Sequence, residues 1–149
     1  MKLLLATDGS KYSDLAAQRI AARQWPDHTE LRIITVVEMM PQSLSRLSTP
    51  KSDLQIQLKA DSVNLAKIAI DQAISIINSQ NHHSLEISTA IIEGTPEEAI
   101  LTESERWGAN LIILGAKGHS DSKITQLGSV TRFLKRYAGR PVLVAQDGQ

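Results

Sequence analysis

Five short apolar segments alternate with helix-like segments along this chain, and that alternation restricts the possible folds more than any other feature. The apolar segments are residues 2–6, 31–37, 85–92, 110–114 and 141–145. The first is a continuous apolar run closed by a turn, which is typical of a strand buried on both faces. Because crossovers between parallel strands are right-handed and place helices on both faces, the order βαβαβαβαβ predicts an α/β fold with one doubly wound, five-stranded parallel sheet.

The starts of two intervening helices are well marked. Ser10 can cap a helix that is broken at Pro26. Thr95 is expected to cap another helix, with Pro96 in its first position and Glu98 closing a capping box.

Apolar spacing predicts the buried face of two helices. In the first helix the positions expected to share a face are Leu15, Ala16, Ile20 and Ala22. A long helix is expected from Asp53 to about Asn78, and its apolar positions, at mostly three- and four-residue steps, are Leu54, Leu58, Leu65, Ile68, Ala69, Ala73 and Ile76.

Composition excludes several functional classes. The 149 residues suit a single domain, residues 1–149. Sixteen basic and sixteen acidic residues give a formal net charge of zero, so the net charge does not indicate binding to a nucleic acid or to a membrane surface. Without cysteine there is no disulfide framework or thiolate zinc site, and the apolar start is too short for a signal peptide. These features predict a cytoplasmic protein.

Residues 39–52 form a long polar connection containing Pro41 and Pro50. Structureless loops of more than about a dozen residues are uncommon in compact domains unless they act as lids or binding loops or are disordered. We therefore expect a mobile or partner-facing segment here.

In a doubly wound sheet, ligands bind beyond the carboxyl ends of the strands. The fourth apolar segment ends in a glycine loop that runs from Gly115 through Gly118 to Gly128, just before a helix from Ser129 to about Tyr137. The free amides and positive dipole end of such a helix attract anions, so this loop predicts a phosphate site.

A helix end contributes only about 0.3 to 1 kcal/mol toward an anion, whereas micromolar affinity needs about 8 kcal/mol. An apolar slot for a base is therefore also required, and Val36 and Leu114, expected at the ends of neighbouring strands, can line it. The glycines also have a simpler reading as turn formers. The loop is not a Walker A motif, and the first strand–helix turn lacks GxGxxG, which disfavours P-loop hydrolysis and conventional dinucleotide binding.

The loop resembles the GxxG, nine residues, G(S/T) signature of the ATP-binding universal stress proteins. The resemblance extends over the whole chain, and further motifs carry it in order: Thr7-Asp8-Gly9-Ser10, Thr35-Val36-Val37, Glu93-Gly94-Thr95-Pro96, Leu111 to Gly115 and Pro141-Val142-Leu143-Val144.

The resemblance implies a strand order 3-2-1-4-5 and a site for ATP, with Mg²⁺ or Mn²⁺ bound through its phosphates. By position, Asp8 would meet the ribose or the base edge, and Gly115 would lie beside the ribose. Val36 and Leu114 would enclose adenine, while the phosphates would be held by Gly118, Gly128, Ser129 and Val130. Lys117 or Lys123 can neutralise phosphate charge, and Asp121 can hold a divalent metal or repel the triphosphate. An aspartate before glycine, such as Asp8, is also an ordinary turn former.

The last apolar segment, residues 141–145, is expected at a sheet edge, where its unpaired backbone favours pairing with a second copy, as in similar proteins. No residue is placed to activate water, so at most slow hydrolysis is expected. The sequence thus predicts an ATP-binding regulatory homodimer of the stress response. Two alternatives stay open, namely an interaction dimer without nucleotide binding and a slow ATP hydrolase or phosphotransferase. AMP or a cyclic nucleotide is also an open choice of ligand.

Overall fold

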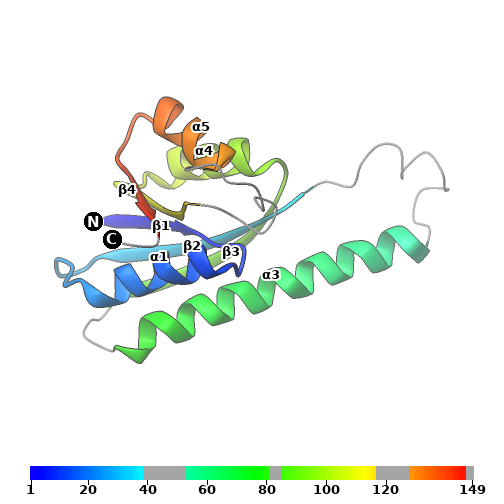
Figure 1. Cartoon of the computed structure of the whole chain (residues 1–149), viewed down its shortest axis with the longest axis horizontal. Helices are drawn as coiled ribbons and strands as arrows, with labels where there is room; N and C mark the ends of the chain where they lie inside the picture. Colours follow the sequence, from blue (N-terminus) through cyan, green and yellow to red (C-terminus); the bar gives the residue numbers. More distant parts are fainter. Residues whose placement is uncertain (39–52, 81–84, 117–127, 147–149) are drawn as a thin grey trace.

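The structure is a computed structural model that describes residues 1–38, 53–80, 85–116 and 128–146. In these ranges strands and helices alternate as the sequence predicts (Figure 1). The elements are β1 (Lys2–Ala6), α1 (Lys11–Ala22), β2 (Glu30–Val37), α3 (Asp53–Ser79), β3 (Glu86–Glu93), α4 (Pro96–Trp107), β4 (Leu111–Gly115), α5 (Ser129–Tyr137) and β5 (Val142–Ala145).

The five strands form one parallel sheet in the order β3-β2-β1-β4-β5, which confirms the predicted topology. β1 is central, and its Leu4 is in register with Arg32 of β2 and Ile112 of β4. Helices α1 and α3 cover one face, and α4 and α5 cover the other (Figure 1).

Side chains of β1 alternate between two hydrophobic cores. Leu3 and Leu5 pack with α1 and α3, whereas Leu4 packs with α4 and α5, and all three are fully buried. A strand buried on both faces has no solvent-facing positions, which explains its unbroken apolar sequence. Truncation of such a leucine to alanine costs about 2 to 5 kcal/mol in other proteins.

The helix starts agree with the predictions in position. The Oγ of Ser10 accepts a hydrogen bond from the backbone N–H of Ser13 at 3.3 Å, which confirms the cap of α1. α4 begins at Pro96 after Thr95, but the Thr95 side chain makes no cap hydrogen bond, so the predicted capping box is wrong. Because Thr95 and Glu98 are both exposed, water can satisfy the first-turn amides instead.

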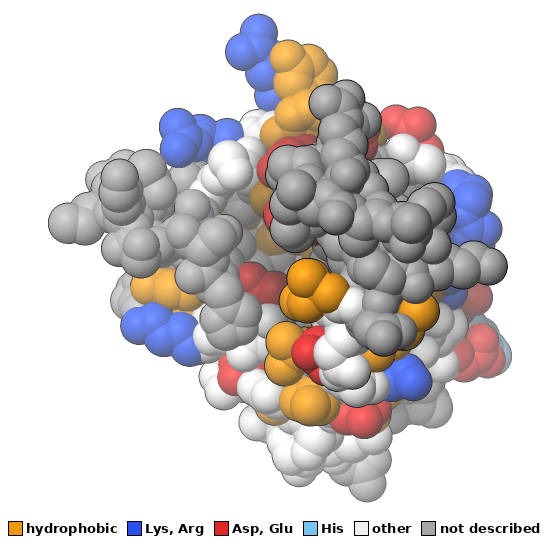
Figure 2. Space-filling view, turned by 90° about the vertical axis from the view of Figure 1, so that its right-hand side faces the viewer, with side chains coloured by type: hydrophobic (Ala, Val, Ile, Leu, Met, Phe, Trp, Pro, Cys, Tyr) orange, Lys and Arg blue, Asp and Glu red, His pale blue; other side chains and the backbone are white. Residues whose placement is uncertain are grey.

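The predicted buried faces are only partly correct. In α1, Ala22 is exposed, whereas Ser13, Ala17 and Ala21 are buried with Ala16 and Ile20. In α3, Ala69 and Ala73 are buried as expected, together with Ala66, Ile70 and Ile77, but Leu54, Leu58, Leu65 and Ile68 are exposed. The N-terminal half of α3 projects past the sheet (Figure 1), and Figure 2 looks onto that end of the molecule, where hydrophobic side chains lie at the surface. Leu65 and Ile68 lie beside the buried Ala66 and Ala69, so the apolar spacing does not show which side of the helix packs on the sheet.

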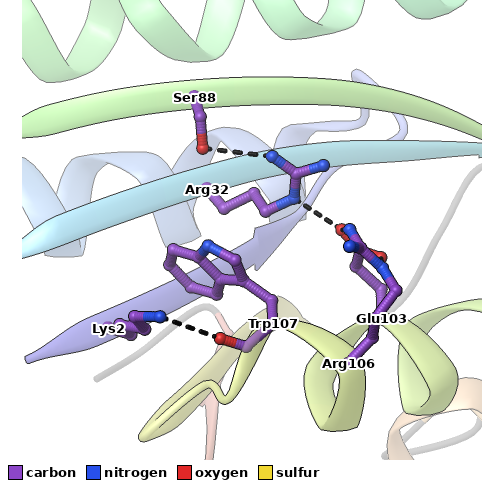
Figure 3. A network of polar contacts seen from close by, with 6 residues as sticks. All are labelled: Lys2, Arg32, Ser88, Glu103, Arg106 and Trp107. Atoms are coloured by element: carbon purple, nitrogen blue, oxygen red, sulfur yellow. Dashed lines mark hydrogen bonds and ion pairs between the residues drawn. The ribbon is translucent and has the colours of Figure 1, made fainter.

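A charged cluster ties β2 to α4 (Figure 3). Glu103 is only 5% exposed, and its carboxylate accepts hydrogen bonds from Arg32 Nε at 2.5 Å and from Arg106 Nη2 at 2.7 Å. Arg32 also donates to Ser88 Oγ on β3 at 3.2 Å. The hydrogen bond from Arg106, followed by the hydrogen bond and charge of Arg32, holds the Glu103 pKa below its usual value, although burial acts in the opposite direction.

Candidate functional site

Asp8 follows β1 and is held in a polar turn at the carboxyl edge of the sheet. Its Oδ1 accepts a hydrogen bond from the Ser10 backbone N–H at 2.9 Å and another from Ser13 Oγ at 2.8 Å. The Ser13 hydroxyl also accepts from the Asp8 backbone N–H at 3.2 Å. This is the turn-forming role that the sequence allows for an aspartate before glycine, and it fixes an exposed carboxylate at the predicted ligand edge.

The turn around Asp8 is anchored to the sheet. The Thr7 backbone N–H donates to the Ile34 carbonyl of β2 at 2.9 Å, and the Gly9 N–H donates to Thr7 Oγ1 at 3.2 Å. Gly9 has a φ of 80°, a left-handed conformation that favours glycine. The position of Asp8 is therefore set by the fold before any ligand binds.

Val36 and Leu114 do not lie on neighbouring strands, contrary to the prediction, because β1 separates β2 from β4. The strand order 3-2-1-4-5 that the resemblance implies already places strand one between them, so the expectation of neighbouring strands does not agree with the expected topology. Both side chains nevertheless belong to one hydrophobic cluster, against which Ala6 of β1 also packs. Leu114 is only 3% exposed, so the accessible apolar surface here comes from the partly exposed Val36 and Ala6.

Gly115 is the last residue of β4, where we expected a glycine that turns the chain off the strand. It is still in register with Ala145 of β5, and its φ is not positive. The need for glycine comes instead from α1, because a Cβ at this position would lie 2.5 Å from the carbonyl carbon of Tyr12 and 2.7 Å from its Cβ. Sequence reasoning missed Tyr12, which is distant in the chain and carries no recognisable motif.

The two ends of the glycine loop are joined at its base. The Gly128 N–H donates to the Ala116 carbonyl at 2.7 Å, and the Ala116 N–H donates to the Ala145 carbonyl at 2.8 Å. The amide of Gly128 thus closes the loop, and its carbonyl accepts from the Arg132 N–H at 3.1 Å, so a phosphate beside Gly128 would use the space left by its missing side chain. Lys117, Gly118, Asp121 and Lys123, which the predictions include, lie outside the described residues.

Helix α5 presents its N-terminus at this point. Gly128 is its N-cap and supplies no side-chain hydrogen bond, and the first turn contains no acidic residue. Ser129 is exposed and Val130 is partly buried against the cluster that contains Leu114. Since first-turn amides and the positive dipole end favour anions, the geometry suits a phosphate group.

Parallel register brings these residues to one edge. Ala6 is paired with Ile34 and Leu5 with Ile113, so the chain after β1, the end of β2 and the end of β4 lie beside one another. The Thr131 hydroxyl of α5 contacts the Gly115 carbonyl at 3.4 Å, which adds the start of α5. The structure thus assembles Asp8, Val36, Gly115 and residues 128–130 around the end of β1.

Thr35 is a polar residue at the same edge that sequence reasoning passed over. Its Oγ1 is the one buried side-chain polar atom without a hydrogen-bond partner in the described part of the chain. Because side chains alternate along a strand, Thr35 faces the α1 and α3 side together with Ile33, opposite to Val36. No sequence signal separates it from an ordinary strand threonine.

Among the helices of residues 1–38, 53–80, 85–116 and 128–146, none has the length and apolar character needed to cross a membrane.

A family model described as the universal stress protein family matches residues 1–146. The chain belongs to the universal stress protein family, as the order of its strands and the glycine loop lead one to expect. The universal stress protein MJ0577 of Methanocaldococcus jannaschii is 23% identical over 97% of this chain and 94% of its own length.

Solved structures share the fold. The structure of MJ0577 superimposes with a TM-score of 0.81, covering 99% of this chain and 97% of that one at 23% identity. A universal stress protein of Archaeoglobus fulgidus in complex with dAMP gives 0.63 at 18% identity, with 98% of each chain covered. A family protein of Arabidopsis thaliana with AMP bound gives 0.60 at 16% identity, covering 97% of this chain and 90% of that one.

Proposed function

We propose that this protein binds an adenine nucleotide, with ATP as the ligand, at the carboxyl edge of the sheet around the end of β1. The observation that carries this proposal is the juxtaposition of the α5 N-terminus, capped by Gly128, with the apolar surface of Val36 and Ala6. One feature suits phosphates and the other suits a base.

The site residues divide by chemistry. Ser129 and Val130 at the start of α5, with Gly118 and Lys117 of the loop, would hold the phosphates, and Asp8 would accept hydrogen bonds from ribose hydroxyls or the base edge. Gly115 would border the ribose, and Val36 with the edge of Leu114 would contact adenine. Mg²⁺ or Mn²⁺ would bind through the phosphates.

The relatives support the adenine part of the proposal. The Archaeoglobus fulgidus and Arabidopsis thaliana structures contain dAMP and AMP, which share an adenine base and a phosphate. The choice of ATP among adenine nucleotides rests on the glycine loop, which has the length and spacing of the ATP-binding branch.

We propose a regulatory role rather than turnover, in a cytoplasmic homodimer. β5 is the last strand of the sheet, so its outer edge is available for pairing with a second copy. Nucleotide occupancy would then alter the contacts of this dimer with partners, for which residues 39–52 are the candidate segment. Asp8, the acid in the described turn after β1, accepts two hydrogen bonds at Oδ1 within its own turn, which favours a fixed binding role over proton transfer.

The test is a thermal-unfolding panel of nucleotide-stripped protein with ATP, AMP, cyclic AMP, NAD, GTP and inorganic triphosphate. A ligand at one hundred times its Kd adds about 2.7 kcal/mol of stability and raises Tm by roughly 5 to 10 °C for a chain of this size. We expect shifts with adenine nucleotides, largest with ATP. Equal shifts with GTP and triphosphate would contradict the base slot, and no shift with any compound would support the interaction dimer.

A further inference from the structure

The N-terminal half of α3 exposes an apolar stripe that its own chain does not cover in the described residues. Leu54, Leu58, Leu65 and Ile68 are 61%, 38%, 67% and 59% exposed. Leu54, Leu58 and Leu65 belong to the N-terminal half of α3, which projects past the sheet (Figure 1), and Ile68 follows directly, beside the buried Ala66 and Ala69. Contiguous exposed leucine and isoleucine side chains are unusual on a monomer and mark interaction surfaces.

The stripe has the spacing of a coiled-coil seam. Leu54, Leu58, Asp61, Leu65 and Ile68 follow one another at steps of four, three, four and three residues, which is the spacing of alternating d and a positions of a heptad. At 3.6 residues per turn these positions lie about a third of a turn away from the core-facing Ala66 and Ala73. The seam therefore points away from the sheet and is suited to a second helix.

We propose that the seam binds the same seam of a second copy of this chain, in an antiparallel pair with its twofold axis near Asp61. Two large apolar residues lie on each side of Asp61, at seven and three residues before it and at four and seven residues after it. An antiparallel copy would place Leu54 opposite Ile68 of the second copy and Leu58 opposite Leu65. A surface that is complementary to itself in this way is the requirement for an isologous dimer.

The residues flanking the seam are compatible with close approach of two copies. Gln57 and Asn64 on one side and Ser62 on the other are uncharged, so no like charges meet along the flanks. Asp61 is the one charged residue in the seam, and its Oδ1 already accepts a hydrogen bond from Gln57 Nε2 at 2.9 Å. At the twofold axis its carboxylate would face the same carboxylate of the second copy, so this residue lowers the affinity of the pair.

Fifteen residues from Leu54 to Ile68 span about 21 Å, or four turns, which is too short for two isolated helices to associate. Here the helix is already formed, because its C-terminal half is packed on the sheet and Lys59 pairs with Glu93 of β3 at 3.3 Å. The seam belongs to the helix beside β2 and β3, whereas the edge of β5 lies at the other side of the sheet. The two self-association surfaces are therefore separate.

Cysteine cross-linking tests the geometry, because the chain contains no cysteine. Asp61→Cys places the thiol at the expected twofold axis, and Ala60→Cys places it on an exposed side of the same helix turned away from the seam. Under mild oxidation we expect Asp61→Cys to form a disulfide-linked dimer at least about tenfold faster than Ala60→Cys. Equal rates for the two variants would overturn the proposal. Pairing through β5 alone cannot produce the difference.

Sedimentation equilibrium of three further variants tests the energetics. Leu65→Glu should weaken self-association at the seam at least about tenfold, since it buries a charge there. Asp61→Leu should strengthen it by a similar factor, and Ala60→Glu is the matched control that should leave it unchanged. Circular dichroism checks that each variant folds, as expected for exposed positions. Leu65→Glu and Asp61→Leu both behaving like Ala60→Glu would overturn the proposal.

Discussion

Gly115 at the end of β4 lies against the backbone of Tyr12 in the first turn of α1, so closely that a Cβ on Gly115 would be 2.5 Å from the Tyr12 carbonyl carbon. This contact packs the start of α1 onto the strand from which the glycine loop departs. The turn that carries Asp8 and the loop proposed to bind phosphate therefore depart from one shared junction.

The first prediction concerns this junction. Gly115→Ala should lower the free energy of unfolding by about 1 to 3 kcal/mol, because backbone atoms of Tyr12 have to move. It should also weaken ATP binding, since the junction positions both halves of the site. Urea unfolding and ATP titration measure the two effects.

Gly139→Ala is the matched control for that substitution. Gly139 has a φ of 65° and open space around it, so its alanine variant should lose roughly 1 to 2 kcal/mol from backbone strain alone. Its ATP affinity should remain that of the wild type. A Gly115→Ala variant with wild-type stability and affinity would contradict the prediction, because it would show that the Tyr12 backbone can move away from the new Cβ at little cost in free energy.

A second prediction separates the two roles of Asp8. Asp8→Asn keeps a carbonyl oxygen that can accept from Ser10 N–H and Ser13 Oγ, so stability should change by less than about 0.5 kcal/mol. Asp8→Ala removes both hydrogen bonds and should cost about 1 to 2 kcal/mol. If the carboxylate also binds the nucleotide, both variants should lose about tenfold or more in ATP affinity. Wild-type affinity in Asp8→Asn would restrict Asp8 to its structural role.

The third prediction concerns pH. Because the arginines hold the pKa of Glu103 below its unfolded value of 4.5, the stabilisation is complete above the unfolded pKa and is lost as pH falls through the folded one. Glu103→Gln should cost about 1 to 3 kcal/mol at pH 7 and should lose less stability than the wild type on acidification. Glu105→Gln, at the exposed neighbouring position, is the control. Parallel pH profiles for wild type and Glu103→Gln would contradict this account.

Much of the fold can be predicted from the sequence because its signals are local. Five apolar runs, Ser10 as a cap and Pro96 at a helix start are each read within a few residues, and all agree with the structure. The faces of α3 are different, because Leu65 and Ile68 lie on a face beside that of the buried Ala66 and Ala69. The apolar spacing of this helix does not show which of the two faces packs on the sheet.

The candidate site also combines positions that the sequence predicts with contacts that it does not predict. The positions of Asp8, Val36 and Gly128 at one edge follow from parallel topology, which the sequence predicts. Two other features depend on packing between distant segments, namely the contact of Gly115 with Tyr12 and the hydrogen bond from the Gly128 amide to the Ala116 carbonyl. The ion pair of Arg32 with Glu103 also could not be predicted, because Arg32 lies in a largely apolar strand and Glu103 in a distant helix.

Isothermal titration calorimetry of nucleotide-stripped protein with magnesium ATP is the most direct test of adenine nucleotide binding at the glycine loop. Wild-type protein and Ala22→Val, an exposed position at the end of α1, should bind with micromolar Kd, near 8 kcal/mol, whereas Gly118→Val should lose at least about a hundredfold. Wild-type affinity no tighter than about millimolar, near 4 kcal/mol, or equal affinity in Gly118→Val, would contradict the claim.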